Sequence, residues 1–294
     1  MMSEIPRRTL GRTGEAVTIF GLGGEGVLRT EGRMSEAVAV IRRALELGVN
    51  YFDSAPAYSG CLDYLGEGLA GRRDQVFVAS KTHDRTRDGS LRLLDQTLRR
   101  LRTDRLDLWQ LHDLRTLRDL EMIFGRGGAM EALLQARDEG RVRFLGITGH
   151  HDPAMLQEAM RRYEFDTALV ALNAADRQRL SFIEDVLPQA AGQNLGVIAM
   201  KVYAQGALLN TGRFGKLLGQ TGLTAEEALG YCLSLREVHT AIIGCRSPAE
   251  VDENARIACG FVEFDKERMQ SLENRLSRKA AQLTSYKKPL FSLE

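Results

Sequence analysis

Eight short apolar runs alternate with longer amphipathic stretches along this sequence of 294 residues. Runs that are apolar throughout are typical of strands buried on both faces, as in a parallel sheet. They cover residues 17–21, 50–53, 76–81, 106–112, 142–147, 167–172, 196–200 and 240–244. Eight such strands alternating with helices predict an α/β fold, a closed (β/α)8 TIM barrel that occupies residues 1–294 as one domain.

The stretches between the runs carry apolar residues at helical spacing. Val38, Ile41 and Leu45 form one such stripe, which Gly48 ends as a C-terminal stop signal. The same periodicity predicts helices over residues 34–47, 90–101, 129–140, 153–163, 224–235 and 248–257.

Three further segments lie outside the eight strand–helix units. Residues 9–18, with Gly11 and Gly14, predict an N-terminal β-hairpin that plugs the bottom of the barrel. Residues 181–192 predict an extra helix before the seventh strand, and residues 265–283 predict an extra C-terminal helix.

Composition argues against several classes of partner. Forty basic and 39 acidic residues almost cancel, without a basic block, so nothing indicates binding to nucleic acid or an anionic membrane. No apolar run approaches the ~20 residues that span a bilayer. The four cysteines are scattered and predict neither a disulfide framework nor a zinc site, and no signal peptide is recognisable. We expect a cytoplasmic protein; no pattern specifies its oligomeric state.

Ionisable residues gather where consecutive strands end. In barrels of this kind the working residues lie at the carboxyl ends of the strands. Asp53 and Tyr58 follow the second strand, Lys81 ends the third and His112 ends the fourth. We therefore expect these four side chains to share one mouth of the barrel.

Their chemistry suits proton transfer to an oxygen. A tyrosine with a pKa near ~10 holds its proton at neutral pH and releases it reluctantly. The ammonium of Lys81, oriented by Asp53, is expected to lower the pKa of Tyr58, and His112 can hydrogen-bond the same substrate oxygen. This arrangement predicts a carbonyl that receives hydride at carbon while Tyr58 protonates its oxygen.

The motifs around these residues resemble those of the aldo-keto reductases over nearly the whole chain. They are Arg-Thr-Leu-Gly-Arg-Thr-Gly at 8–14, Gly-Leu-Gly-Gly at 21–24, Asn-Tyr-Phe-Asp-Ser-Ala-Pro-Ala-Tyr at 50–58, Val-Ala-Ser-Lys at 78–81 and Leu-His at 111–112. The resemblance implies that Tyr58 is the general acid, that Lys81 and Asp53 tune it, and that His112 orients the carbonyl. It also implies NADPH more often than NADH, and no metal.

A loop near the C-terminus suits the phosphates of the cofactor. Residues 242–254 are similar to the adenosine-phosphate segment of the same family. Barrels often bind phosphate after strands seven and eight at a helix N-terminus, and the fork of Arg246 suits a 2′-phosphate. We therefore expect NADPH, with NADH as the weaker ligand, although Glu250 stands where relatives often carry a basic residue and also has capping-box spacing from Ser247.

The segments that would hold the nicotinamide depart from the family pattern. Thr148-Gly149 stands in place of Ser-Asn, Asn173 in place of a glutamine, and Met200-Lys201 in place of an aromatic residue. Asn173 could replace the amide contact, and Met200 could pack the ring. The full set of expected cofactor contacts is Gly23, Gly24, Asp53, Thr148, Gly149, Asn173, Met200, Lys201, Gly244, Cys245, Arg246, Ser247 and Asn254.

Other interpretations stay open. Residues 21–26 match G-x-G-x-x-G, but the next helical pattern begins only near Met34, which argues against a dinucleotide-binding fold. Lys81 could be the Schiff-base lysine of an aldolase. The altered nicotinamide contacts fit an NADPH-binding regulatory subunit with slow turnover. His150-His151 suggests a metal pair, but adjacent side chains rarely face the same way.

The expected substrate is a small molecule with a carbonyl group. The segment 113–128 is predicted to form one wall of the substrate pocket, and the tail after Leu283 another. Both segments mix basic and apolar residues, which fits aldehydes, ketones and sugar-derived carbonyls equally.

Overall fold

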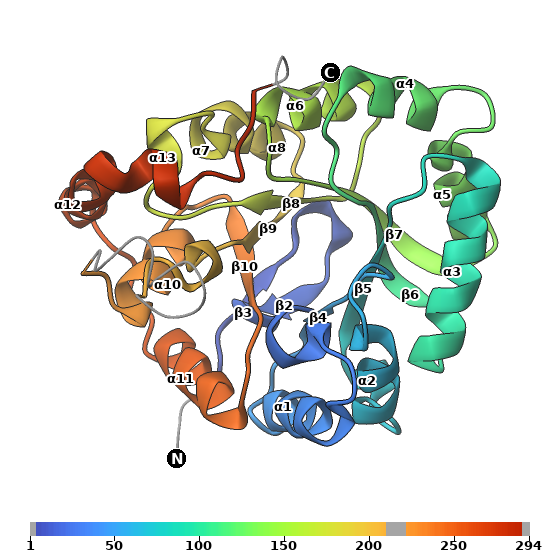
Figure 1. The fold of residues 1–294 in the computed structure, drawn as a ribbon, viewed down its shortest axis with the longest axis horizontal. Helices are drawn as coiled ribbons and strands as arrows, with labels where there is room; N and C mark the ends of the chain where they lie inside the picture. The colour runs from blue at the N-terminus through green and yellow to red at the C-terminus, as the bar shows by residue number, and fades with distance from the viewer. Residues whose placement is uncertain (1–3, 210–221, 290–294) are drawn as a thin grey trace.

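Eight parallel strands close into a barrel in the computed structural model, which describes residues 4–209 and 222–289. The order around the barrel is β10-β3-β4-β5-β6-β7-β8-β9, and helices surround the strands (Figure 1). The strands are β3 (Phe20–Leu22), β4 (Tyr51–Asp53), β5 (Phe77–Thr82), β6 (Leu106–Leu111), β7 (Val142–Gly149), β8 (Thr167–Ala171), β9 (Gly196–Met200) and β10 (Val238–Ile243). The predicted fold class is confirmed.

The strands are buried on both faces. Every residue of β5 and β6 is buried, as expected where helices cover the outside and side chains fill the inside. Inside the barrel, one cluster of apolar side chains combines residues from strands all around the sheet: Tyr51, Phe77, Ala79, Leu108, Leu169, Ile198 and Ile242.

A β-hairpin lies across the bottom of this interior. Strands β1 (Arg7–Thr9) and β2 (Ala16–Thr18) pair antiparallel, and Leu10 and Val17 join the cluster of interior side chains. Gly11 has φ +48°, and a Cβ atom there would lie 2.3 Å from the backbone nitrogen of Gly196, so glycine permits this close approach. The hairpin plug is confirmed. The predicted strand over 17–21 is wrong in detail, because Ile19 separates β2 from the barrel strand β3.

The six helices predicted from periodicity are present within a few residues of their expected ends. They are α1 (Met34–Glu46), α3 (Arg87–Leu101), α5 (Ala129–Asp138), α6 (Pro153–Arg162), α10 (Ala225–Leu233) and α11 (Pro248–Cys259). The helix α2 (Cys61–Gly68) is additional. Its Gly66 and Gly68 lower helix propensity but allow close packing, since a Cβ atom on Gly66 would lie 2.3 Å from the carbonyl oxygen of Arg100.

The extra segments form shorter pieces than expected. Residues 181–192 contain α7 (Phe182–Asp185) and α8 (Leu187–Gly192), separated next to Pro188, which lacks the amide hydrogen a continuous helix needs. The C-terminal segment contains α12 (Lys266–Leu276) and α13 (Ala280–Leu283), and the expected wall 113–128 contains α4 (Leu117–Phe124). Short 3₁₀ turns occur at Gly11–Thr13, Gly26–Arg29, Arg73–Gln75, Asp176–Gln178, Ala204–Gly206 and Ser277–Lys279.

Two observations bear on the environment of the chain. None of the helices in the described ranges combines the length and the apolar character needed to cross a membrane. The four cysteines, all within the described ranges, are free thiols.

Candidate active site

The four expected catalytic side chains lie at the carboxyl ends of neighbouring strands. Asp53 is the last residue of β4, and Tyr58 lies in the turn that leads to α2. Lys81 is the penultimate residue of β5, and His112 directly follows β6. Because β4, β5 and β6 pair in parallel, their ends open onto the same mouth of the barrel.

Asp53 and Lys81 form a buried ion pair. The Nζ atom of Lys81 lies 2.5 Å from Oδ2 of Asp53 and donates a second hydrogen bond of 2.8 Å to the carbonyl oxygen of Ser54. Burial raises the pKa of Asp53, and the charge of Lys81 opposes this rise. The pair fixes the ammonium at the end of β5, where its position depends on both bonds.

Tyr58 lies beside this ammonium. The Nζ atom of Lys81 is 5.2 Å from the centroid of the tyrosine ring, and the ring of His112 meets it edge-on with a centroid distance of 5.9 Å. The guanidinium carbon of Arg29 lies 5.0 Å from the same centroid. A Cβ atom on Gly24 would lie only 2.7 Å from Cδ2 of Tyr58, so the glycine makes room for the ring.

The pKa of Tyr58 differs from the sequence-based expectation. Burial, followed by the charge of Asp53, raises the pKa of Tyr58 well above its ordinary value. The expectation of a lowered pKa is therefore wrong, because burial outweighs the effect of nearby positive charges and the ammonium of Lys81 is paired with Asp53. The phenol is fully protonated at neutral pH.

His112 is a neutral imidazole at neutral pH. Burial, followed by the charge of Lys81, lowers the pKa of His112 to about 3. Its backbone is fixed on both sides, since its amide donates to the carbonyl oxygen of Thr82 at 2.8 Å and its carbonyl accepts from Arg85 at 2.9 Å. A neutral imidazole can donate one hydrogen bond to a substrate oxygen without bringing a charge.

The candidate phosphate loop joins β10 to α11. The glycine-rich loop that begins at Gly21 packs beneath it, since the amide of Val27 donates to the carbonyl oxygen of Cys245 at 3.0 Å. Gly26 has φ +70°, and a Cβ atom there would lie 2.3 Å from that same oxygen. The G-x-G-x-x-G match at 21–26 is thus a turn over the barrel mouth, and α1 begins only at Met34.

Arg246 is engaged by Glu250. The carboxylate of Glu250 accepts from the backbone amide of Arg246 at 2.7 Å and from its Nε at 2.8 Å. Ser247 caps α11 by accepting from the amide of Glu250 at 3.4 Å, but the carboxylate returns to Arg246 instead of completing a capping box. The Arg246 side chain remains 61% exposed, so a phosphate can reach it but meets the carboxylate of Glu250 there.

Two other expected cofactor residues support this loop from beneath. Asn254 is buried, donates to the carbonyl oxygen of Glu250 at 2.7 Å and accepts from the hydroxyl of Tyr203 at 2.5 Å. Cys245 is buried and its thiol has a pKa raised to about 12 by burial, which makes it inert packing. A Cβ atom on Gly23 would lie 3.2 Å from the amide nitrogen of Gly244, so the glycine-rich loop that begins at Gly21 and the candidate phosphate loop pack closely at these two glycines.

The expected nicotinamide contacts differ in which side-chain groups remain available to bind a ligand. Asn173 donates to the carbonyl oxygen of Lys201 at 3.2 Å and to the hydroxyl of Tyr286 at 3.0 Å, and it accepts from the amide of Ala175 at 3.0 Å. Its amide is thus already used within the chain, which disfavours Asn173 as a replacement for the family's glutamine contact. Met200 packs against the cluster of interior side chains.

The remaining positions surround the mouth. Thr148 accepts from the amide of Asp113 at 2.7 Å, and a Cβ atom on Gly149 would lie 3.1 Å from the Leu156 side chain. Lys201 has φ +56°, and its Nζ atom lies 5.1 Å from the ring centroid of Tyr286. Burial lowers the pKa of Lys201, which is opposed by the charges of Glu25 and Asp113.

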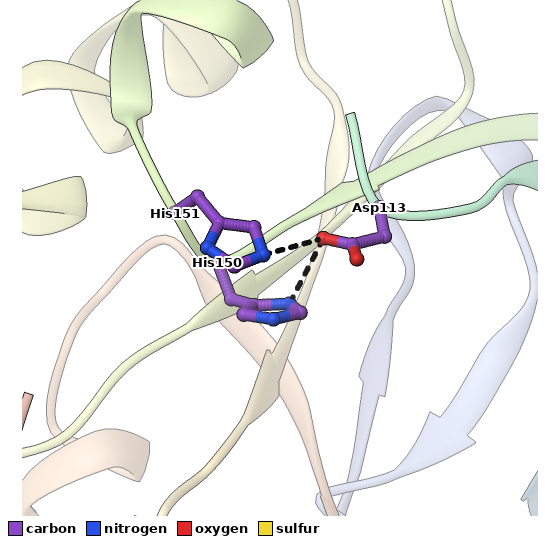
Figure 2. A group of neighbouring side chains, drawn as sticks. All are labelled: Asp113, His150 and His151. Carbon is purple, nitrogen blue, oxygen red and sulfur yellow. Dashed lines mark ion pairs between the residues drawn. The ribbon is translucent and has the colours of Figure 1, made fainter. Parts of the chain in front are cut away.

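One cluster was missed by sequence reasoning. His150 and His151 both face Asp113, with distances of 3.3 Å and 3.4 Å from a ring nitrogen to Oδ1 (Figure 2). The expectation that these adjacent side chains point apart is wrong. Burial lowers the pKa of His150 to about 3, and contacts with His151, His150 and Arg115 hold the pKa of Asp113 well below its ordinary value although burial acts to raise it. The only sequence signal was the histidine pair itself.

Arg29 and Tyr286 were also missed. Arg29 contacts the ring of Tyr58, and Tyr286 lies next to Asn173 and Lys201, although each is distant in sequence from its partner. No local motif marks either residue. They reach the mouth because the early loop and the C-terminal segment both cross it.

Comparison with known proteins agrees with a (β/α)8-barrel enzyme. The model of the Aldo/keto reductase family matches residues 19–222. L-galactose dehydrogenase of Arabidopsis thaliana is 28% identical over 284 residues, which are 86% of this chain and 88% of that protein. The holo form of aldo-keto reductase AKR11C1 from Bacillus halodurans is 25% identical, with a TM-score of 0.76 over 92% of this chain and 96% of that one.

A further solved neighbour agrees in fold. An aldo-keto reductase from Klebsiella pneumoniae, solved in complex with NADPH, has a TM-score of 0.74 at 24% identity and covers 94% of this chain and 96% of its own. The chain belongs to the aldo/keto reductase family. It is an NAD(P)H-dependent oxidoreductase.

Proposed function

We propose that this enzyme uses NADPH to reduce an aldehyde or ketone to an alcohol, with Tyr58 as the proton donor. The observation that carries this proposal is the grouping of a protonated phenol, a buried ammonium and a neutral imidazole around one point of the barrel mouth. Bound NADPH supplies the hydride to the carbonyl carbon. The protein supplies the proton and the binding of the carbonyl oxygen.

Tyr58 and Lys81 share the work of proton transfer. Tyr58 gives its proton to the oxygen as negative charge develops there, which leaves a phenolate. The ammonium of Lys81, 5.2 Å from the ring centroid, stabilises that phenolate electrostatically. Asp53 acts as a positioning residue, because its ion pair holds Lys81 in place. His112 donates a hydrogen bond to the same oxygen.

The proposed cofactor path runs from the phosphate loop to the barrel mouth. Gly244, Cys245, Arg246 and Ser247 form the loop at the N-terminus of α11, where amides and the helix dipole favour phosphate. Arg246 is the proposed partner of the 2′-phosphate, which distinguishes NADPH from NADH. The Klebsiella neighbour was solved with NADPH, and this agrees with the proposed ligand.

The nicotinamide end is proposed to lie between the two sides of the mouth. Thr148, Gly149, Met200 and Lys201 line it from β7 and β9, and Gly23, Gly24 and Asp53 line it from β3 and β4. Asp53 is 1% exposed, so its carboxylate acts on the bound cofactor through the position of Lys81.

The proposed substrate class is a small polar carbonyl compound, sugar-derived carbonyls included. Besides the partly buried Tyr58, the mouth carries Arg29, Lys201 and the cluster of Asp113, His150 and His151, which suits a substrate with several hydroxyl groups. The relative from Arabidopsis is named L-galactose dehydrogenase, and this supports testing aldoses first.

The aldolase alternative is weakened by the surroundings of Lys81. A Schiff-base lysine must act as a neutral amine. Lys81 is 1% exposed and paired with Asp53 at 2.5 Å, which favours its charged form. A regulatory subunit with slow turnover would keep the same binding site, and the rate of hydride transfer distinguishes it from an enzyme.

A panel of carbonyl compounds tests the proposal. Purified protein is mixed with NADPH and, in parallel, with aldoses, simple aldehydes and ketones, and the loss of NADPH absorbance is followed. We expect steady turnover with at least one class and stoichiometric alcohol product. Tight NADPH binding with no hydride transfer in a single turnover would instead favour the regulatory subunit.

A further inference from the structure

A second cluster of ligand-type side chains lies at the same mouth of the barrel. Asp113 follows His112 after β6, and His150 and His151 follow β7. Figure 2 shows both imidazoles directed at one carboxylate oxygen. We propose that Asp113, His150 and His151 bind a divalent transition-metal ion of the zinc class.

The distances fit such an ion. Asp113 Oδ1 lies 3.3 Å from Nδ1 of His150 and 3.4 Å from Nε2 of His151. Metal–ligand distances of about 2.0–2.2 Å in a tetrahedral zinc site put neighbouring ligand atoms about 3.3–3.5 Å apart. All three candidate ligand atoms lie within 4.8 Å of one another.

The cluster has unused polar atoms. Asp113 Oδ1 and both ring nitrogens of His151 are buried and make no hydrogen bond of good geometry to any described residue, although Oδ1 lies 3.3–3.4 Å from a nitrogen of each imidazole, and His151 is 7% exposed. Buried polar atoms without partners cost free energy and call for an explanation. A bound cation would use a lone pair from each of the three residues.

The surrounding contacts hold the carboxylate in place. Arg115 binds the other oxygen of Asp113, Oδ2, at 2.5 Å and 2.7 Å, which leaves Oδ1 for the imidazoles. Thr148 accepts from the amide of Asp113 at 2.7 Å, and Arg85 donates to its carbonyl oxygen at 2.9 Å. Such outer contacts orient ligands in known metal sites.

The chemistry of the ligands sets the class of ion. Two imidazoles and one carboxylate favour Zn²⁺, Co²⁺ or Ni²⁺, whereas Mg²⁺ and Ca²⁺ take oxygen ligands. The charges of Arg115 and Lys201 lie close by and oppose a cation, so we expect an affinity well below that of a structural zinc finger. The proposal departs from the expectation of no metal, which the family resemblance implied, and from the separate expectation that the two histidines face apart.

The inference does not rest on the proposed function. Tyr58, Lys81, Asp53 and His112 are not among the ligands, but the three ligand residues lie at the mouth that is proposed to receive the substrate, so metal binding is measured directly and not through turnover. Binding itself is the readout.

Cobalt titration of the full chain tests the proposal. Protein treated with a chelator and then dialysed is titrated with Co²⁺, and the visible d–d absorption of the ion is recorded. A parallel calorimetric titration with Zn²⁺ gives the stoichiometry and the dissociation constant. We expect one ion per chain and absorption typical of four- or five-coordinate cobalt.

Matched histidine variants locate the site. His150→Gln and His151→Gln should each weaken binding at least about tenfold, in line with the loss of a ligand. His83→Gln, at an exposed histidine outside the cluster, should leave binding unchanged. Because His151 is buried, the partly exposed His150 supplies the variant that keeps the test independent of folding, which circular dichroism monitors for each protein.

Three results would overturn the proposal. They are cobalt that stays octahedral with wild-type protein, an affinity unchanged in the His150→Gln variant, and binding lost equally in the His83→Gln variant. Zinc should also raise the midpoint of thermal unfolding of the wild type but not of His150→Gln, because an ion that binds only the folded state stabilises it.

Discussion

The Nζ atom of Lys81 lies 2.5 Å from Oδ2 of Asp53, and both side chains are almost completely buried. This ion pair fixes the position of the Lys81 ammonium in the site. The desolvation of two buried charges is offset only while both partners are present. The pair therefore couples the stability of the barrel to the position of the ammonium beside Tyr58.

Breaking this pair should destabilise the protein. Lys81→Met leaves Asp53 buried without its partner, and we expect a loss of about 3 kcal/mol in the free energy of unfolding at neutral pH. Adding Asp53→Asn should recover most of this loss, because no charge then remains buried. Urea unfolding measures the free energy of unfolding of the single and the double variant. The exposed pair Arg105–Asp74, 2.8 Å apart, is the control, and Arg105→Met should cost less than about 1 kcal/mol. A Lys81→Met loss no larger than that of the control would contradict the coupling.

Gly24→Ala should displace Tyr58. The added Cβ atom would lie 2.7 Å from Cδ2 of Tyr58 and 2.9 Å from the carbonyl oxygen of Asp53. Overpacking of this kind costs about 1–3 kcal/mol, and the ring can relieve it only by moving. We expect kcat/KM to fall by at least about tenfold, since a small misplacement of a catalytic group is costly. Gly192→Ala, with no atom within 4 Å of the new Cβ, is the matched control. Equal activity in the two variants would show that Tyr58 does not need this space.

Arg246→Ala should weaken NADPH selectively. The charge-assisted contact with the 2′-phosphate is worth about 1–3 kcal/mol, whereas NADH has no phosphate there. Fluorescence titration with the two cofactors gives both dissociation constants. Equal losses for NADPH and NADH would refute the assignment of Arg246 to the 2′-phosphate.

Glu250→Gln should strengthen NADPH binding. Glu250 holds Arg246 through bonds of 2.7–2.8 Å, so a 2′-phosphate must displace the carboxylate and also meets its charge. An exposed ion pair of this kind is worth about 0.2–1 kcal/mol, and its removal should tighten NADPH a few-fold while leaving NADH nearly unchanged. Glu253→Gln, at an exposed acid on the same helix, controls for the change of net charge. The same gain in both variants would assign the effect to net charge alone.

The raised pKa of Tyr58 predicts a flat pH profile for reduction. Burial comes first among its causes and the charge of Asp53 second, and both favour the protonated phenol. The protonated phenol of Tyr58 is fully populated below its pKa and is lost only as the pH rises through that pKa. Because that pKa lies above its ordinary value of ~10, kcat/KM should change little between about pH 6 and pH 9. A fall centred near neutral pH would show that the phenol ionises there.

The barrel could be predicted because its strands are buried on both faces. An all-buried strand such as β6 has a continuous apolar run, which local sequence shows directly. The boundary at Ile19 could not be predicted, because β2 and β3 join two sheets within one apolar run. The helix α2 was missed because its glycines serve tertiary packing against neighbouring helices at the expense of helix propensity.

The site was predictable where the ends of neighbouring strands bring residues together. Asp53, Lys81 and His112 follow from the parallel order of β4, β5 and β6 alone. The raised pKa of Tyr58 could not be predicted, because the burial of that ring depends on Gly24 and on the packing of distant loops. The approach of His150 and His151 to Asp113 depends on the path of the chain after β7 and on the left-handed conformation of Asp113, with φ +57°.

The central claim is that Tyr58 gives the proton, and single-turnover hydride transfer in Tyr58→Phe tests it most directly. The variant keeps the ring between Lys81 and His112 and removes only the hydroxyl. We predict that NADPH binds with a dissociation constant within about twofold of wild type, while hydride transfer to the best carbonyl substrate slows by at least the 10²–10⁴-fold typical of general acid catalysis. Hydride transfer at the wild-type rate in a variant that binds NADPH normally would contradict the account.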